Sequence, residues 1–439
     1  QINVPRDYWT QVIDIELPPI VRLERQGGGE DAITKAAKLL SEAKFPVILS
    51  GAGVVIGDAI KDCKKLAEKL EAPVCNGYQH NDSFPGSHPL AVGPLGYNGS
   101  KAAMELISKA DVVLALGTRL NPFSTLPGYG IDYWPKKASI IQVDMNSDRI
   151  GLTKKVTVGI CGDAKLVSQQ ILEKLSSNAG DKGREERKNL IHQTKSAWLQ
   201  TLTSLDHEDD DPGTVWNKEA RERDSDRMSP RQAWRAIQAG MPEDVIISSD
   251  IGNNCAIGNA YPTFEKGRKY LAPGLFGPCG YGFPSILGAK IGCPDTPVIG
   301  FAGDGAFGIS MNEMSSCARK EWPKITMVIF RNYQWGAEKR NSILWFDDNF
   351  VGTELDPELS YAKVANACGL KGVTVKTMEE TTKAIKQSCE DQKKGITTFI
   401  EVILNQELGE PFRRDAMKKP VEVAGINKKD MKPQKSAIN

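Results

Sequence analysis

Two short turns hold the residues of this sequence that are best suited to do chemistry. The first is Gly303-Asp304-Gly305, and the second is Asn332-Tyr333-Gln334, which follows the apolar run 325–330. Asp304 offers a carboxylate, Asn332 an amide oxygen and Gln334 a backbone carbonyl, and Mg²⁺ prefers oxygen ligands of these kinds. Glycine lets the backbone approach a phosphate where unpaired N–H groups begin a helix. The two turns therefore predict a site for Mg²⁺ and a diphosphate.

The order of elements around these turns resembles a known cofactor motif. A Gly-Asp-Gly turn, an amphipathic helix, an apolar strand and an Asn-containing turn make up the thiamine diphosphate (ThDP) motif of the acetolactate synthase and pyruvate decarboxylase superfamily. The resemblance implies ThDP and Mg²⁺ as cofactors, with Asp304, Asn332 and Gln334 as metal ligands. That superfamily usually has Asn-Asn where this chain has Arg331-Asn332, so the role of Arg331 is open. A tight turn in a doubly wound domain is the structural alternative.

Two earlier segments extend the resemblance. Residues 249–254 are similar to the first diphosphate-contacting turn of the superfamily, and residues 276–284 are similar to its glycine-rich stretch. Within that stretch Cys279 occupies the position of the apolar side chain that supports the thiazolium ring, and a merely buried cysteine is the alternative. The resemblance assigns cofactor contacts to Asp250, Gly252, Asn253, Asn254, Cys279, Gly303, Gly305, Ala306, Trp335 and Gly336.

Three further segments narrow the resemblance. Residues 332–340, 345–355 and 407–415 together closely resemble the sulfoacetaldehyde acetyltransferase family. The resemblance implies that sulfoacetaldehyde and phosphate are converted into acetyl phosphate and sulfite during taurine breakdown. Acetolactate synthase, or another ThDP-dependent 2-oxoacid enzyme, is the alternative among enzymes. A non-catalytic ThDP-binding subunit or truncated scaffold is the alternative of another class.

The implied reaction needs two anions, a sulfonate and a phosphate, close to the cofactor. Arginine forks suit both oxyanions. Arg413 and Arg414 are the first candidates, and Lys339 and Arg340 are the second. Each of the four is equally well explained as an ordinary surface cation.

The resemblance also predicts what lies outside the sequence. Superfamily enzymes have pyrimidine-binding, central and diphosphate-binding domains, and only the last two have counterparts here. Gln1 in place of a methionine favours a preceding pyrimidine-binding domain, which in relatives supplies the activating glutamate. We therefore expect this chain alone to be inactive, and the whole enzyme to be a homodimer or homotetramer with active sites between subunits.

Composition excludes several classes of protein. Lys and Arg number 56 against 55 Asp and Glu, which gives no support for nucleic-acid or membrane partners. The longest apolar runs are strand-sized, and no signal peptide opens the chain, so we expect a soluble cytoplasmic protein. The nine cysteines are scattered without a C-x-x-C pair, which favours reduced thiols over zinc or disulfides.

The pattern of helices and strands around these turns predicts an α/β fold. Continuous apolar runs, such as 45–50, 111–117 and 139–144, alternate with helical patterns, which predicts parallel sheets covered on both faces. We expect two doubly wound, Rossmann-like domains. The expected divisions are a connector over 1–25, a central domain over 26–176, a charged linker over 177–228, a diphosphate and Mg²⁺ domain over 229–410, and a tail over 411–439.

One motif in the central domain invites a nucleotide interpretation. Gly51-Ala52-Gly53 follows a predicted strand, but Gly57 falls one position late for the complete G-x-G-x-x-G pattern. We therefore interpret Gly51-Ala52-Gly53 as a structural turn between a strand and a helix.

Overall fold

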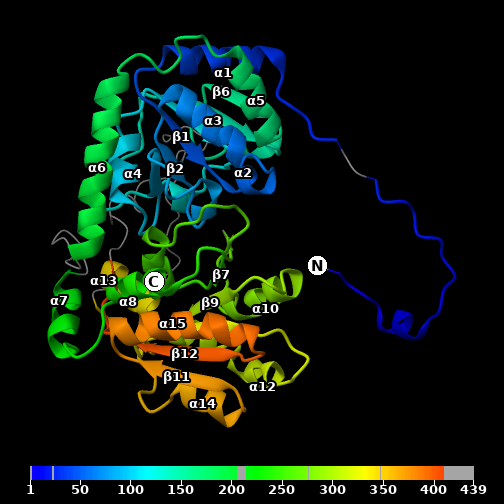
Figure 1. Cartoon of the computed structure of the whole chain (residues 1–439), viewed down its shortest axis with the longest axis vertical. Helices are drawn as coiled ribbons and strands as arrows, with labels where there is room; N and C mark the ends of the chain where they lie inside the picture. Colours follow the sequence, from blue (N-terminus) through cyan, green and yellow to red (C-terminus); the bar gives the residue numbers. More distant parts are fainter. Residues whose placement is uncertain (1, 22–23, 205–213, 275, 347, 410–439) are drawn as a thin grey trace, which may run out of the picture.

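The computed structural model describes residues 2–21, 24–204, 214–274, 276–346 and 348–409. Residues 2–21 are exposed and run outside the main body of the molecule in Figure 1. They hold one short 3₁₀ turn, η1 (Arg6–Thr10). The expected tail over 411–439 lies outside the described residues.

The first sheet has six strands in the order β3-β2-β1-β4-β5-β6, and every pairing in it is parallel. Its strands are β1 (Pro46–Ser50), β2 (Val74–Asn76), β3 (Ala91–Pro94), β4 (Val112–Leu116), β5 (Ser139–Asp144) and β6 (Val158–Cys161). All five residues of β1 and of β4 are buried. Such runs are typical of parallel strands that helices cover on both faces.

Helices pack around this sheet, as Figure 1 shows. They are α1 (Glu30–Glu42), α2 (Ala52–Ile56), α3 (Ile60–Leu70), α4 (Lys101–Ile107) and α5 (Ala164–Lys174). Three 3₁₀ turns lie in the loops, namely η2 (Asn81–Ser83), η3 (Pro122–Ser124) and η4 (Ser147–Arg149). The apolar faces of α1 and α3 are buried, because both helices space their apolar residues at helical intervals.

The second sheet also has six parallel strands, in the order β11-β12-β10-β9-β7-β8. Its strands are β7 (Ile246–Ser249), β8 (Tyr270–Leu271), β9 (Val298–Gly303), β10 (Thr326–Arg331), β11 (Lys371–Val375) and β12 (Thr398–Ile403). The two sheets confirm the predicted fold class of two doubly wound α/β units.

The helices of the second unit are α8 (Pro230–Gly240), α9 (Asn253–Ile257), α10 (Gly282–Gly292), α11 (Asp304–Gly308), α12 (Met314–Cys317), α13 (Gly336–Trp345), α14 (Tyr361–Ala367) and α15 (Met378–Lys393), with 3₁₀ turns η5 (Gly258–Ala260) and η6 (Met311–Glu313). Ser229 caps α8 through a capping box with Gln232, with Pro230 at the first helical position. The prediction of a single amphipathic helix after Asp304 is wrong. That segment is divided into α11, η6 and α12, since Gly308 and Ser310 are poor helix formers.

Two helices, α6 (Arg184–Ser204) and α7 (Thr214–Arg223), follow the first unit in the chain, and in Figure 1 they lie along one side of the molecule, α6 beside α4 and α7 beside the second unit. Arg187 is buried at the start of α6 and donates hydrogen bonds to the carbonyls of Leu70 and Glu71 at 2.9 and 2.8 Å. These bonds satisfy carbonyls at the end of α3 and fix α6 to the first unit. The acidic run 208–211 lies outside the described residues. Among the described helices, none has the length and apolar character that a bilayer span needs.

Buried polar side chains join the two units directly. Asp82 accepts hydrogen bonds from the backbone N–H groups of Lys269 and Tyr270 at 2.9 and 3.3 Å. Asn81 donates to the carbonyls of Asn259 and Pro262, both at 2.8 Å. The units are therefore held together by directional bonds to fixed backbone groups, which sets their relative orientation.

Candidate functional site

Three parallel neighbours of the second sheet bring the predicted residues to one edge. Strands β7, β9 and β10 are adjacent, and each ends immediately before a polar residue, Asp250, Asp304 or Asn332. Because carboxyl ends of parallel strands share an edge, these side chains meet there, as at the ligand sites of open α/β sheets. All three residues are buried.

Asp304 lies at the centre of this edge and is 1% exposed. Its Oδ2 accepts hydrogen bonds from Arg331 Nη1 at 3.1 Å and from the Tyr333 N–H at 2.7 Å. Its Oδ1 accepts one from the Gly305 N–H at 2.9 Å. Burial raises the pKa of Asp304 to about 6, although Arg331 and the backbone N–H groups act in the opposite direction. The carboxylate is thus fixed in position, and Oδ1 retains room for a further partner.

Arg331 occupies the position whose role the sequence left open. Its guanidinium is fully enclosed and makes ion pairs with Asp304 at 3.1 Å and Glu401 at 3.8 Å. It also donates hydrogen bonds to the carbonyls of Asp356 and Leu359. A planar fork with several donors suits such a set of oxygens better than a lysine would. Arg331 therefore holds Asp304 in place from the side of β12.

The second turn is held in an uncommon backbone conformation. Tyr333 has φ of 60°, which a residue other than glycine adopts at a cost of roughly 1–3 kcal/mol. The bond from its N–H to Asp304, and the Arg331 guanidinium 4.2 Å from its ring centroid, stabilise this conformation. The turn carries Asn332 and Gln334 towards the edge where Asp304 lies.

Several buried polar atoms at this edge have no hydrogen-bond partner among the described residues. They are Asn332 Nδ2, Gln334 Oε1 and Asn254 Oδ1. A buried polar group without a partner costs about 1–3 kcal/mol, so its persistence indicates a ligand that supplies the missing partner. No group of three or more His, Cys, Asp or Glu side chains that could hold a metal occurs in the described ranges. The oxygen donors for a cation at this edge are one carboxylate together with amides and carbonyls.

The glycines predicted to contact the cofactor have two different roles. A Cβ at Gly305 would lie 2.8 Å from the Trp335 ring, so only glycine allows this ring to pack on the turn. A Cβ at Gly252 or Gly303 would meet nothing within 4 Å, which leaves their backbone open to a ligand. Gly252 also has φ of 124°, which favours glycine. Ala306 and Gly336 are buried beside these turns.

Asp250 organises the glycine-rich stretch. Its carboxylate accepts hydrogen bonds from the N–H groups of Ile251 at 2.8 Å, Gly280 at 3.1 Å and Gly282 at 2.7 Å. Cys279 lies in this stretch and is exposed, so the interpretation of Cys279 as a merely buried cysteine is wrong. Partial desolvation raises the pKa of its thiol, as do Asp250 and Glu338. The thiol is neutral at neutral pH and presents a small apolar surface.

The second pair of cationic candidates lies inside the protein. Lys339 and Arg340 are 6% and 4% exposed, so the interpretation of either as a surface cation is wrong. Lys339 pairs with Glu354 at 2.6 Å, and Arg340 donates to the Tyr97 hydroxyl and the Leu408 carbonyl. Arg413 and Arg414 lie outside the described residues.

The sequence predicted the strand-end residues at this edge, but it did not predict the contacts of Asn253 with Tyr97 and Leu408 or of Arg331 with Asp304. Asn253 donates to the same Leu408 carbonyl as Arg340, and its Oδ1 accepts from the Tyr97 hydroxyl at 3.3 Å. The motif Gly96-Tyr97-Asn98-Gly99 belonged to the resemblance, yet nothing in its spacing indicated this contact across units. The partnership of Arg331 with Asp304 was likewise hidden, although a charged residue at the end of a buried strand was a signal.

Two comparisons with known families match the two units. Residues 33–174 match the thiamine pyrophosphate enzyme central domain, and residues 250–402 match the C-terminal TPP binding domain of these enzymes. Thiamine pyrophosphate is another name for ThDP. The second match includes Asp250, Asp304 and Asn332, and the cofactor of the family is therefore ThDP.

The chain is also similar to individual proteins. It is 78% identical to a probable sulfoacetaldehyde acetyltransferase of Rhizobium meliloti (strain 1021), over 99% of this chain and 74% of that protein. It is 73% identical to a sulfoacetaldehyde acetyltransferase of Roseovarius nubinhibens, over 99% of this chain and 72% of that protein.

A solved structure agrees in fold. The crystal structure of benzoylformate decarboxylase from Polynucleobacter necessarius superposes with a TM-score of 0.67 at 19% identity, covering 92% of this chain and 70% of that one. The close relatives and both domain matches lead to one assignment. The chain belongs to the sulfoacetaldehyde acetyltransferase family of thiamine pyrophosphate enzymes.

Proposed function

We propose that this protein uses ThDP and Mg²⁺ to convert sulfoacetaldehyde and phosphate into acetyl phosphate and sulfite. The observation that carries the proposal is the 78% identity, over nearly the whole chain, to the probable sulfoacetaldehyde acetyltransferase of Rhizobium meliloti. The edge of the second sheet supports it, because the Asp304 carboxylate, the Asn332 amide and the Gln334 turn are buried together there, and Mg²⁺ prefers oxygen ligands of these kinds.

Named residues would hold the cofactor at this edge. Asp304 Oδ1, the Asn332 side-chain oxygen and the Gln334 carbonyl would bind the metal ion. The open backbone at Gly252 and Gly303 would lie against the diphosphate. Cys279 would support the thiazolium ring with its neutral thiol. When bound, ThDP supplies a stabilised carbanion, and the protein supplies position, electrostatics and exclusion of water.

Cationic residues would place the two anions. Arg340 and Lys339 lie beside the glycine turns of the second sheet and near the first unit, since Arg340 contacts Tyr97. A guanidinium in a site of low dielectric attracts a sulfonate or phosphate strongly. We assign anion binding to Arg340 and Lys339 in this proposal, together with Arg413 and Arg414 as the sequence predicts.

The test is an assay of the protein at the full length that its gene encodes. Sulfoacetaldehyde, phosphate, ThDP and Mg²⁺ should give sulfite and acetyl phosphate in equal amounts, and omission of phosphate, ThDP or Mg²⁺ should stop both. Chelation with EDTA followed by Mg²⁺ addition should restore the rate. No sulfite under the complete conditions would contradict the proposed substrate.

The same assay separates the alternatives. If pyruvate yields acetolactate and CO₂ while sulfoacetaldehyde yields no sulfite, the protein is an acetolactate synthase-like enzyme. If ThDP binds with Mg²⁺ and neither substrate reacts, the protein is a non-catalytic ThDP-binding subunit. Each result excludes the proposed function while leaving the cofactor site intact.

A further inference from the structure

Arg340, in α13, is a buried cation without a carboxylate partner. It is 4% exposed, and no Asp or Glu of the described residues forms an ion pair with it. Lys339 beside it differs, because its ammonium group pairs with Glu354 at 2.6 Å. A buried charge is costly unless other groups compensate it. Arg340 therefore needs acceptors other than carboxylates of the described chain.

The hydrogen-bond donors of Arg340 are only partly used. Its two terminal nitrogens donate to the Tyr97 hydroxyl and the Leu408 carbonyl, whereas its Nε is buried and has no partner among the described residues. Arg187 is also buried, but it donates to backbone carbonyls through its Nε and through both terminal nitrogens. Carbonyls can thus satisfy a whole buried guanidinium, and at Arg340 one acceptor is missing.

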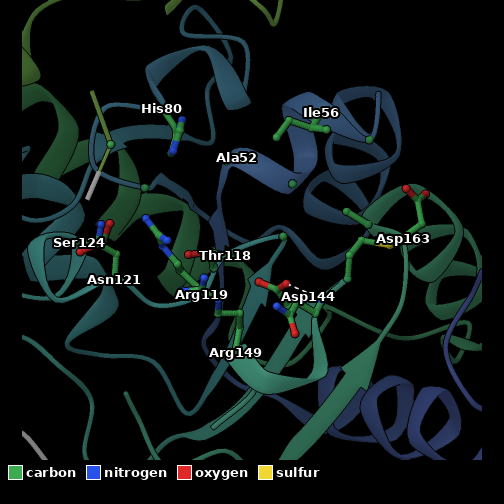
Figure 2. Close-up of a pocket in the computed structure, with 18 of the residues that line it drawn as sticks. Ala52, Ile56, His80, Thr118, Arg119, Asn121, Ser124, Asp144, Arg149 and Asp163 are labelled. Carbon is green, nitrogen blue, oxygen red and sulfur yellow. Dashed lines mark hydrogen bonds between the residues drawn. The ribbon is translucent and has the colours of Figure 1, made fainter. Parts of the chain in front are cut away.

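Arginines near the surface give no such indication. Figure 2 shows Arg119 and Arg149 in the wall of a cavity at the carboxyl edge of the first sheet, where both side chains are partly exposed. Water hydrates side chains of this kind, so they need no protein partner. Little water reaches a guanidinium that is 4% exposed, and an unused donor there is costly. The missing acceptor is therefore informative at Arg340.

A closed ring of hydrogen bonds holds Arg340 in one orientation. Arg340 donates to the Tyr97 hydroxyl, and that hydroxyl donates to Asn253 Oδ1 at 3.3 Å. Asn253 Nδ2 and the other terminal nitrogen of Arg340 both donate to the Leu408 carbonyl, which closes the ring. Because a guanidinium is planar and rigid, two fixed points set the direction of its remaining side. The ring therefore orients the unused Nε–H.

The backbone of Tyr97 is held from both units. Its N–H donates to the Phe123 carbonyl at 3.1 Å, and its carbonyl accepts from Asn259 Nδ2 at 3.3 Å. A Cβ at Gly96 would lie 1.8 Å from the Phe123 carbonyl oxygen, so only glycine allows the turn to approach this closely. The Tyr97 ring centroid lies 5.4 Å from the Arg340 guanidinium. The tyrosine is thus in place before any ligand binds.

The ring borders the edge at which the cofactor is proposed to bind. Asn253 directly follows Gly252, whose backbone is open to a ligand. A Cβ at Gly336, the first residue of α13, would lie 3.4 Å from the Asn253 Cβ and 3.7 Å from Leu408 Cδ2. Arg340 lies one helical turn after Gly336. An acceptor at Arg340 Nε would therefore lie next to the proposed ThDP site.

We propose that Tyr97 is a positioning residue, which orients Arg340 so that the Nε–H side of its guanidinium binds the tetrahedral oxyanion of a substrate. The inference rests on the proposed function, which assigns anion binding to Arg340. Sulfonate and phosphate present the same kind of oxygen acceptors to a guanidinium. Tyr97 acts through Arg340 and does not touch the substrate. The first unit thereby contributes to a site whose other residues belong to the second.

Isothermal titration of the full-length protein, loaded with ThDP and Mg²⁺, tests the proposal with phosphate and with ethanesulfonate. Ethanesulfonate carries the sulfonate without an aldehyde, so binding is measured without turnover. Tyr97→Phe removes only the hydroxyl, and we expect it to weaken binding of at least one of these anions about fivefold or more. The anion that is weakened is the one that Arg340 binds. Affinity for ThDP should stay within about twofold, because Tyr97 does not contact the cofactor.

A matched control and a double variant separate positioning from a general structural effect. Tyr133→Phe removes another hydroxyl of the first unit, one that donates to the Ser124 carbonyl at 3.3 Å, and it should bind both anions as the wild type does. Arg340→Lys keeps the charge but loses the fork, and it should weaken the same anion. Tyr97→Phe added to Arg340→Lys should cost less than about twofold more, because Tyr97 acts only through Arg340.

Kinetics of the same variants give a second measurement. Tyr97→Phe should raise the KM of the substrate that carries this anion about fivefold, with kcat within about twofold of the wild type. Unchanged anion affinity in Tyr97→Phe, additive losses in the double variant, or a wild type that binds neither anion would each overturn the proposal. A wild type that binds the anions but releases no sulfite would contradict the proposed function instead, and the role of Tyr97 would stand.

Discussion

The two sheets share a parallel architecture, yet their carboxyl edges hold charge in opposite ways. At the second sheet, Asp304 and Arg331 are enclosed and bonded to each other and to backbone groups. At the first sheet, Arg119 and Arg149 are partly exposed and have no protein partner within the described ranges. One edge has its charges fixed before any ligand arrives, and the other leaves them free.

This difference follows from how deeply each edge is buried and from what the second edge is proposed to bind. A dication and a diphosphate carry concentrated charge, and a buried site can hold them only if its own charged groups are paired and aligned beforehand. At the first sheet the two arginines are partly exposed, so their side chains can reorganise in water. The same sheet architecture thus supports two kinds of edge through the loops that follow its strands.

Removing the guanidinium at the fixed edge should have the largest effect on folding. Arg331→Met leaves Asp304 and Glu401 buried without a cation, and we expect a loss of about 3–5 kcal/mol in the free energy of unfolding. Urea denaturation followed by tryptophan fluorescence measures this loss. Arg319→Gln, which breaks an exposed pair with Glu321, is the control and should cost less than about 1 kcal/mol. Equal costs would show that Arg331 does not brace the fixed edge.

A chemical footprint should show a smaller, local effect of the cofactor. Cys279 is exposed, and we expect ThDP with Mg²⁺ to slow its alkylation by iodoacetamide several-fold, because the proposed thiazolium covers the thiol. Cys161 is also exposed but lies at the end of β6 in the first unit, so its rate should not change. Mass spectrometry of peptides after timed alkylation gives both rates. Protection of Cys161 alone would indicate that the cofactor binds at the first sheet, which would contradict the proposed site.

The sequence predicted the sheets well because each strand is marked by a pattern of neighbouring residues. Continuous apolar runs separated by helical patterns indicated β1, β4, β5 and β10 with errors of about one residue. The turns at Asp304 and Asn332 were also local, since strand ends and polar residues coincide there. Parallel pairing then brings them to one edge without further information.

What the sequence did not predict depends on distant contacts. Cys279 is exposed beside Gly280 and Gly282, whose N–H groups bind Asp250, and no sequence pattern indicates that geometry. Arg331 pairs with Glu401 across neighbouring strands, which becomes visible only when β10 and β12 are aligned. The segment after Asp304 was predicted as one continuous helix from its amphipathic pattern. The weak helix formers Gly308 and Ser310 divide it in the structure.

The central claim is that the cofactor lies at the fixed edge of the second sheet. Titration of ThDP into the full-length protein, with and without Mg²⁺, tests it most directly through the variants Asp304→Asn and Arg119→Gln/Arg149→Gln. We predict that Asp304→Asn weakens Mg²⁺-dependent binding by at least about a hundredfold, since a charged ligand to the dication is lost. The arginine variant should bind ThDP as the wild type does. Unchanged affinity in Asp304→Asn, or loss confined to the arginine variant, would contradict the account.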